Sequence, residues 1–233
     1  MAFTDDLRAE VTKILKEQWT SRDGTKVPDT PDLKLANDAV KLTGTVLYAD
    51  LADSTGLVTL YKPEFVAAVY KVYLNCACRI IREKGGEITA FDGDRVMAVF
   101  LGSGMATNAC RAALAINHAV VEILNPKVRE QYPNLPQSFR VSQAVGIDMS
   151  SLFVARTGIR GANDLVWVGR AANIAAKLCS LREGTYATYI TNDVYSAADE
   201  SVRVSRDGKS MWESYPEAVR NLTVRRSSWH WAL

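Results

Sequence analysis

The chain has 233 residues, 48% of them hydrophobic, and its net charge at pH 7 is +2. These values predict one globular domain with a short additional segment, and the small charge argues against a nucleic-acid partner. No apolar run is long enough to cross a bilayer and no signal-peptide pattern is present, so we expect no membrane partner. The cysteines lack metal-ligand spacing, and we expect them to be reduced, as in a cytoplasmic protein: Cys76, Cys78, Cys110 and Cys179.

The first part of the chain differs in pattern from the rest. Apolar residues recur at helical spacing over 5–19, which predicts an amphipathic helix. Polar residues with one glycine and two prolines follow and predict a linker, so we separate an N-terminal helix and linker, 1–41, from a main domain, 42–233. Two interpretations of the helix remain open: its apolar side packs on its own domain, or it contacts a second protomer.

The main domain alternates between strand and helix patterns. We expect, in order, a strand at 45–52, a helix at 63–83, strands on either side of a turn at 92–94, a helix at 105–124, a strand region at 139–155 with a turn at 148–151, a strand at 165–169 and a helix at 171–181. This order predicts an α+β fold, in which helices cover one face of a mixed, mainly antiparallel sheet.

Two acidic residues stand at the ends of predicted strands. Asp50 ends a buried strand, and Asp94 lies at the tip of the predicted hairpin. If the hairpin flanks the first strand, both carboxylates meet at one edge, where they suit Mg²⁺ or Mn²⁺. The alternative is that Asp94 only serves the turn.

Small polar residues follow Asp50 and predict a second feature of the site. Between a strand end and a helix start they can expose backbone N–H groups to phosphate oxygens. The candidate phosphate-binding residues are Ala52, Asp53, Ser54 and Thr55. The alternative is a helix N-cap formed by Ser54 or Thr55.

A third pattern places Asn173 and Lys177 four residues apart on one face of a predicted helix. Two such donors can hold a ribose oxygen and a phosphoryl group during its transfer. Read in isolation, the same pair also fits a solvated helix surface.

Together, the segments YADLADST, GGEITAFDGDRVMAVF and DLVWVGRAANIAAKL resemble the catalytic domain of class III adenylate and guanylate cyclases, over about residues 42–190. The resemblance implies a ferredoxin-like βααββαβ palm that works as a head-to-tail homodimer. It further implies that Asp50, Leu51 and Asp94 of one protomer hold two divalent cations, while Asn173 and Lys177 come from the other. The implied reaction is attack of the ribose 3′-oxygen of a nucleoside triphosphate on the α-phosphate, with release of pyrophosphate.

The departures from this pattern concern the base. Ala90 and Val166 stand where the family has polar purine-reading residues, and Lys177 stands where it has an arginine. Tyr48 and Arg95 are placed to line the base pocket instead, and arginine donors suit the two carbonyl groups of uracil. This combination resembles the stand-alone pyrimidine cyclases of bacterial antiphage defence. We therefore expect UTP as the substrate, ahead of CTP; the alternative is that Arg95 lies on the surface.

The resemblance also implies a separate effector protein that binds the cyclic product. Two other functions remain open: an adenylate or guanylate cyclase with atypical base contacts, and a non-catalytic nucleotide-binding dimer. The turn FDGDR does not match the GGDEF-like turn of a diguanylate cyclase. The basic residue that binds the triphosphate is not identified by the sequence; the candidates are Arg170, Lys209, Arg225 and Arg226.

Overall fold

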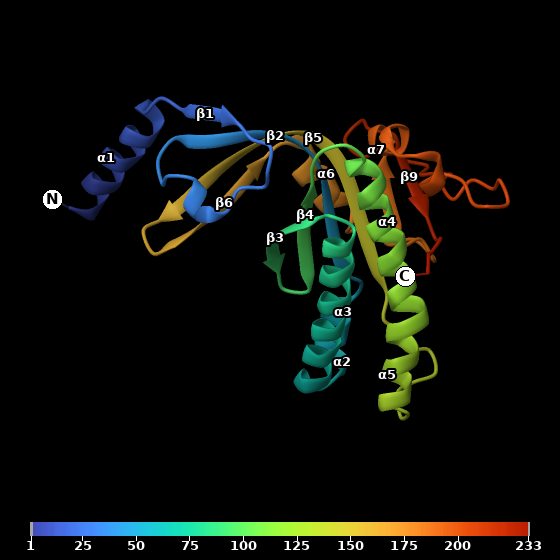
Figure 1. Ribbon diagram of the computed structural model, residues 1–233. Coiled ribbons are helices and arrows are strands. Elements are labelled where there is room, and N and C mark those ends of the chain that lie inside the picture. Colours follow the sequence, from blue (N-terminus) through green and yellow to red (C-terminus); the bar gives the residue numbers. More distant parts are fainter. Residues whose placement is uncertain (1, 233) are drawn as a thin grey trace. The chain divides into compact units, whose positions relative to one another are not determined.

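The computed structural model describes residues 2–232 (Figure 1). The chain forms two compact units, which we describe separately. The core unit contains Gly44–Ser150 and everything from Arg170 onwards, and the N-terminal unit contains the residues up to Thr43 together with Ser151–Gly169. Among the described residues, no helix combines the length and apolar character needed to cross a membrane.

The core unit is built on a mixed sheet in which the strands lie in the order β3-β4-β2-β5-β7-β9-β8. β7 is parallel to β5, whereas β4 is antiparallel to both of its neighbours and β9 is antiparallel to β7 and β8. Two of the strands, β2 and β5, run on into the N-terminal unit. The bounds are β2 (Asp38–Leu51), β3 (Glu87–Asp92), β4 (Arg95–Phe100), β5 (Gln143–Ile159), β7 (Thr188–Thr191), β8 (Glu213–Ser214) and β9 (Val224–Ser227).

Helices connect these strands in the order of the predicted palm. They are α2 (Ser54–Leu60), α3 (Pro63–Glu83), α4 (Met105–His118), the π-helix η2 (Ala119–Leu124), α5 (Asn125–Gln131), α6 (Arg170–Leu178), α7 (Asn192–Ala197) and the 3₁₀ helix η3 (Glu200–Val202). The expected helix at 63–83 is confirmed residue for residue. The expected helix at 105–124 is longer than predicted, because helical backbone passes through a π-helical stretch into α5, which carries a proline in its first turn.

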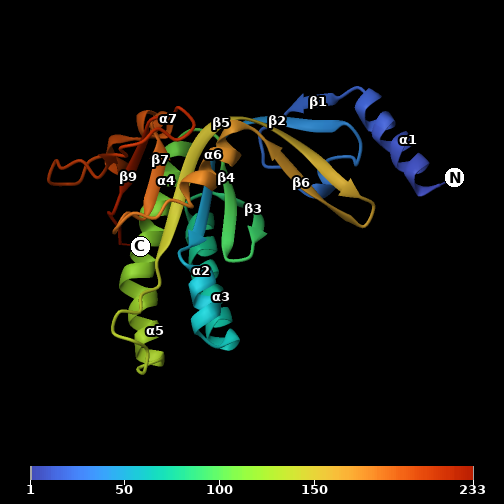
Figure 2. The same ribbon diagram turned by 180° about the vertical axis from the view of Figure 1, so that it is seen from behind.

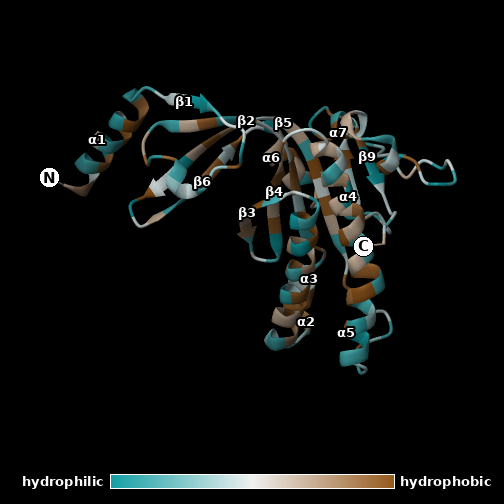
Figure 3. Ribbon diagram, in the orientation of Figure 1, coloured by the Kyte–Doolittle hydropathy of each residue, from teal (hydrophilic) through white to brown (hydrophobic). Residues whose placement is uncertain are grey.

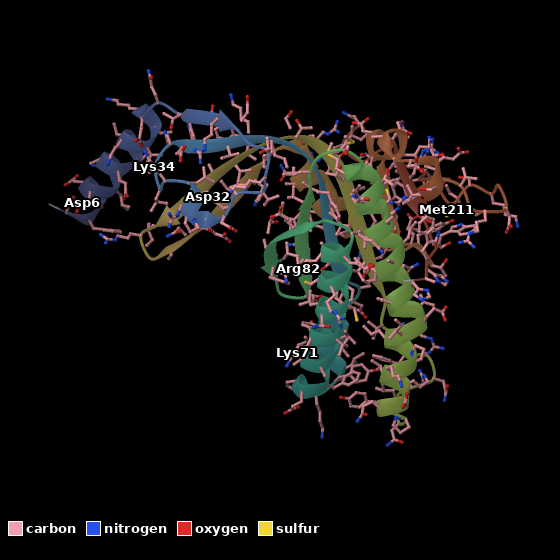
Figure 4. All side chains as sticks on the ribbon, viewed as in Figure 1. Asp6, Asp32, Lys34, Lys71, Arg82 and Met211 are labelled. Atoms are coloured by element: carbon pink, nitrogen blue, oxygen red, sulfur yellow. The ribbon has the colours of Figure 1, made fainter. Side chains whose placement is uncertain are left out.

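One face of the sheet is covered by α3 and α4, which lie side by side (Figures 1 and 2). Alternate residues of β2 point to this face, so Leu47, Ala49 and Leu51 join the hydrophobic core with both helices. Figure 3 shows apolar residues concentrated in α4 and the central strands. The opposite side of α3 is polar and carries Lys71 and Arg82 in solvent (Figure 4).

The other face of the sheet carries α6. The prediction that helices cover only one face was therefore wrong. A Cβ atom on Gly146 of β5 would lie 2.2 Å from the carbonyl oxygen of Ala175 and 2.4 Å from the amide nitrogen of Cys179. The missing side chain therefore lets α6 approach the strand closely. Ala144, Ile174 and other residues form a second, smaller hydrophobic cluster here.

The turn expected at 148–151 was a wrong prediction, because β5 continues through it as one strand of 17 residues. The polar residues that suggested a turn are held in the strand instead. Asp148 is fully buried and accepts a hydrogen bond from Thr191 Oγ1 at 2.6 Å. A buried carboxylate with partners does not need the solvent that a turn provides.

The N-terminal unit contains α1 (Phe3–Lys16), β1 (Thr20–Asp23), the 3₁₀ helix η1 (Thr30–Asp32) and β6 (Ala162–Val168), with the first residues of β2 and the last of β5. Part of the expected linker is therefore a strand, because β1 pairs in parallel with β2. The domain boundary expected at residue 42 stays a prediction, and β2 runs across it. No described residue of α1 is buried, so its apolar side remains exposed.

Candidate functional site

The carboxylates of Asp50 and Asp94 are brought to one edge of the sheet by strand pairing. Asp50 lies opposite Arg95 in the register of β2 and β4, and Asp94 is the residue directly before Arg95. Gly93 adopts a φ of +62°, which closes the tight turn between β3 and β4. A strand end and a hairpin tip therefore meet, as the sequence predicted.

The electrostatics of this pair favour a bound cation. Burial, and then the negative charge of Asp94, raise the pKa of Asp50. The Oδ2 atom of Asp94 is buried and has no hydrogen-bond partner among the described residues. A buried carboxylate oxygen without a partner is costly, and a divalent metal ion would supply the missing charge.

The available ligands are oxygen atoms, which suit Mg²⁺ or Mn²⁺. Within residues 2–232, His, Cys, Asp and Glu form no cluster of three or more that could hold a metal ion. Two carboxylates and the Leu51 carbonyl group are hard oxygen donors, and Mg²⁺ commonly takes one or two carboxylates with water and substrate phosphates. Asp50, Leu51 and Asp94 are the residues that would hold such ions.

Arg182, which sequence reasoning missed, also lies at this edge. Its Nη2 donates to Asp50 Oδ2 at 3.1 Å and to the Leu51 carbonyl oxygen at 3.2 Å. Its Nη1 donates to the carbonyl groups of Cys179 and Leu181, just beyond α6. Arg182 is 132 positions from Asp50 in the sequence, so no local pattern could have revealed the contact.

The segment after Leu51 forms a strained turn into α2. Asp53 has φ 55° and ψ 38°, a left-handed conformation that is uncommon outside glycine. Its side chain accepts from the amide of Gly56 and forms the N-cap. The alternative prediction, an N-cap formed by Ser54 or Thr55, named the wrong residue. The amide of Ala52 donates to the Ser142 carbonyl oxygen at 2.9 Å, so this N–H is already engaged.

The residues expected to read the base lie partly together. The guanidinium of Arg95 stands 5.4 Å from the ring centroid of Tyr48, on the sheet face that also carries Asp50. Arg95 Nη2 donates to Asp92 Oδ2 at 2.5 Å, while its Nε is buried and unpartnered. Ala90 lies on the adjacent strand, opposite Met97.

The remaining predicted site residues are on β6 and α6. Val166 is on β6, in the N-terminal unit. Asn173 and Lys177 are exposed on one face of α6, whose other face is buried against the sheet. No hydrogen bond or ion pair found within the described chain joins Asn173 or Lys177 to the carboxylate pair.

Comparison with known proteins shows which proteins this chain resembles. No family model matches the chain. A uridylate cyclase of Xanthomonas perforans is 48% identical and one of Burkholderia cepacia is 43% identical, each alignment covering 100% of both chains. The solved structure of the adenylyl cyclase CyaB from Pseudomonas aeruginosa has the same fold, with a TM-score of 0.64 at 22% identity over 81% of this chain and 95% of that one.

This chain belongs to the class III nucleotide cyclase family. It is an enzyme, a lyase that cyclises a nucleotide. The fold is the class III palm, and the sheet edge that carries Asp50 and Asp94 lies at the end of its central strands.

In this cyclase, the candidate triphosphate-binding arginines are engaged in other contacts. Arg170 forms ion pairs with Asp148 at 3.1 Å and Asp193 at 2.6 Å. Arg225 and Arg226 each lie 3.9 Å above a tyrosine ring. Arg226 also pairs with a glutamate, and Lys209 lies in the loop after η3. Arg182 contacts the carboxylate of Asp50 directly. No such contact is seen for Arg170, Lys209, Arg225 or Arg226 among the described residues.

Proposed function

We propose that this cyclase converts UTP into 3′,5′-cyclic UMP and pyrophosphate. The observation that carries the proposal is the buried, unpartnered oxygen of Asp94 beside Asp50, with Arg95 and Tyr48 on the same sheet face. The relatives of Xanthomonas perforans and Burkholderia cepacia, both named uridylate cyclase, support the choice of base. CTP is the next candidate.

The proposed chemistry assigns separate tasks to the residues of the site. Two divalent ions, Mg²⁺ or Mn²⁺, would supply the charge that acidifies the 3′-hydroxyl group and neutralises the triphosphate. Asp50, Asp94 and the Leu51 carbonyl group would hold these ions where β2 ends beside the β3–β4 turn. The turn containing Asp53, Ser54 and Thr55 faces the phosphates, although the amide of Ala52 is not free to contribute.

The base is held by the Arg95 side chain. The Arg95 side chain is 28% exposed, and its guanidinium N–H groups are donors that suit the carbonyl groups of uracil. Tyr48 fixes the guanidinium from one side through the cation–π contact. Ala90 offers no hydrogen bond to a purine edge, which is consistent with a small pyrimidine pocket.

The transition state requires a second protomer. Asn173 and Lys177 point away from the sheet, because the rest of α6 is buried on it. A head-to-tail homodimer would place them opposite Asp50 and Asp94 of the partner and would create two equal sites. Lys177 would then meet the charge that develops on the transferring phosphoryl group.

The decisive experiment for the reaction is an assay of purified protein with Mn²⁺ and each of ATP, GTP, CTP and UTP, with products separated by chromatography. We expect cyclic UMP to dominate and Asp50→Asn to abolish it. Cyclic AMP or cyclic GMP as the main product would overturn the choice of base. Equal, negligible product from wild type and Asp50→Asn with all four substrates would favour the non-catalytic dimer.

The shared site can be tested by mixing two inactive variants, Asp50→Asn and Asn173→Ala. A mixed head-to-tail dimer contains one doubly damaged site and one intact site, so subunit exchange should restore about a quarter of wild-type activity. A site built within one chain would stay inactive after mixing. Unchanged circular dichroism spectra of both variants provide the folding control.

We further propose that the product is a second messenger in antiphage defence, made in the cytoplasm and bound by a separate effector protein. This part rests on the resemblance to pyrimidine cyclases of such systems. Cells that carry the enzyme with its genetic neighbours should resist phage, and Asp50→Asn should remove the resistance. Equal resistance with the variant would contradict the role of the product.

A further inference from the structure

Arg182 places a positive charge on the atoms that we assign to the metal site. One nitrogen, Nη2, is within hydrogen-bond distance of both Asp50 Oδ2 and the Leu51 carbonyl oxygen. The Arg182 side chain is 34% exposed and that of Asp50 is 19% exposed, so the pair is only partly shielded from water. The guanidinium thus neutralises Asp50 at a place where a divalent ion would do the same.

A metal ion and the Arg182 guanidinium compete for Asp50 Oδ2 and the Leu51 carbonyl oxygen, because both are cations. Mg²⁺ binds oxygen at about 2.0–2.1 Å, and an arginine held at hydrogen-bond distance from the same lone pairs repels it. A bound metal ion therefore favours a state in which Arg182 has left Asp50. Because the pair is only partly shielded from water, its displacement costs less than that of a fully buried pair.

A cavity next to Arg182 can receive the displaced side chain. Its volume is about 610 Å³, and its lining includes Ala52, Asp53, Arg140, Gln143 and Arg182, all within the core unit. Gln143 is 5% exposed, and neither its amide nitrogen nor its amide oxygen has a partner. The lining holds two arginines and two acidic residues, and one of the acidic residues, Glu183, is paired with Arg226. The arginines beside the 52–53 turn can therefore donate to an anionic ligand.

Combining these observations, and resting on the proposed metal site, we propose that Arg182 is the resident cation of the metal-free enzyme. Divalent ions displace its guanidinium from Asp50 into the adjacent cavity, where it binds the polyphosphate of the substrate. Arg182 then acts as a substrate-binding residue whose position is coupled to metal occupancy.

The test measures Mn²⁺ affinity without nucleotide, from the electron paramagnetic resonance signal of free Mn²⁺. Arg182→Ala should bind Mn²⁺ about 3- to 10-fold more tightly than wild type, because the competing cation is gone. Arg140→Ala is the matched control. It removes the same charge from the same cavity, but within residues 2–232 the Arg140 side chain donates to the carbonyl groups of Gln137 and Phe139 and not to Asp50. Its Mn²⁺ affinity should stay within about twofold of wild type because of screening.

The second measurement is the binding of inorganic tripolyphosphate at saturating Mn²⁺, followed by calorimetry. Arg182→Ala should weaken it about 5- to 10-fold, since a charge-assisted contact is lost. Arg182→Lys is the control for a disturbed C-terminal end of α6. Lysine keeps the positive charge but lacks the planar guanidinium group. The affinities for Mn²⁺ and for tripolyphosphate should therefore fall between those of wild type and Arg182→Ala.

The inference requires these two opposite changes. Unchanged or weaker Mn²⁺ binding, or unchanged tripolyphosphate binding, in both Arg182 variants would overturn it. Asp50→Asn distinguishes this from failure of the proposed function. If Asp50→Asn binds Mn²⁺ as tightly as wild type, the metal site itself is wrong; if it loses Mn²⁺ while the Arg182 variants match wild type, only the role of Arg182 is wrong.

Discussion

The Cζ atom of Arg95 lies 5.4 Å from the ring centroid of Tyr48, so a cation and an aromatic face are paired beside the acidic edge. We expect Arg95→Ala to lower kcat/KM for UTP by about 100-fold, because a site that loses a hydrogen-bonding base reader loses discrimination. Metal-dependent turnover of other nucleotides should remain. Competition between UTP and CTP measures the change.

Tyr48→Phe is the matched control for this prediction. It keeps the aromatic face under Arg95 and removes only the hydroxyl group, so the preference for UTP should persist. An Arg95→Ala enzyme with wild-type preference would show that the guanidinium lies outside the base pocket.

The pKa of Asp50 predicts an unusual dependence of stability on pH. Since burial and Asp94 raise this pKa, the ionised carboxylate is less favourable in the folded chain than in the unfolded chain. This loss of folding stability is absent below the unfolded-state pKa of about 3.9, where Asp50 is protonated in both the folded and the unfolded chain. It is complete above the folded-state pKa. In EDTA, Asp50→Asn should therefore melt at a higher temperature than wild type at pH 7.

This difference should vanish as the pH falls to about 3.5, where the wild-type carboxyl group is protonated. Excess Mn²⁺ at pH 7 should make the wild type melt at a higher temperature than Asp50→Asn, because only the wild type has the Asp50 carboxylate as a metal ligand. Thermal unfolding followed by circular dichroism from pH 3.5 to 8 measures both effects. A wild type that is more stable than Asp50→Asn in EDTA at every pH would contradict the prediction.

The Arg170–Asp148 ion pair predicts a structural role for Arg170 in place of triphosphate binding. Asp148 is fully buried, so Arg170→Ala would leave its charge without its arginine partner and should lower the free energy of unfolding by about 2–4 kcal/mol. Asp193→Asn removes only the half-exposed partner and should cost less than about 1 kcal/mol. Equal, small changes in urea unfolding would show that the buried pair is unimportant.

Gly146 predicts a coupling between packing and catalysis. Gly146→Ala would place a methyl group against the backbone of α6, and overpacking of this kind costs about 1–3 kcal/mol. The helix must shift, and with it Asn173 and Lys177. We expect both the melting temperature and turnover per folded molecule to fall. An unchanged melting temperature would indicate that α6 does not pack as closely as the structure shows.

The local parts of the fold and site could be predicted from the sequence. The helix at 63–83 follows from a starting proline and a terminal glycine pair, and the hairpin follows from Asp92-Gly93-Asp94. The convergence of Asp50 and Asp94 followed once the hairpin was placed beside the first strand. By contrast, β1 was predicted as linker because four exposed residues carry no strand pattern.

The sequence by itself determined the order of most elements and the position of Asp94 at a hairpin tip, because each depends on residues that are close in the chain or on strand alternation. Only the tertiary structure decided that β5 runs unbroken through Asp148, that α6 lies on the second face of the sheet, and that Arg182 contacts Asp50. These features depend on partners far apart in the chain. Local propensity does not encode such contacts, because they form only when the folded sheet brings the partners together.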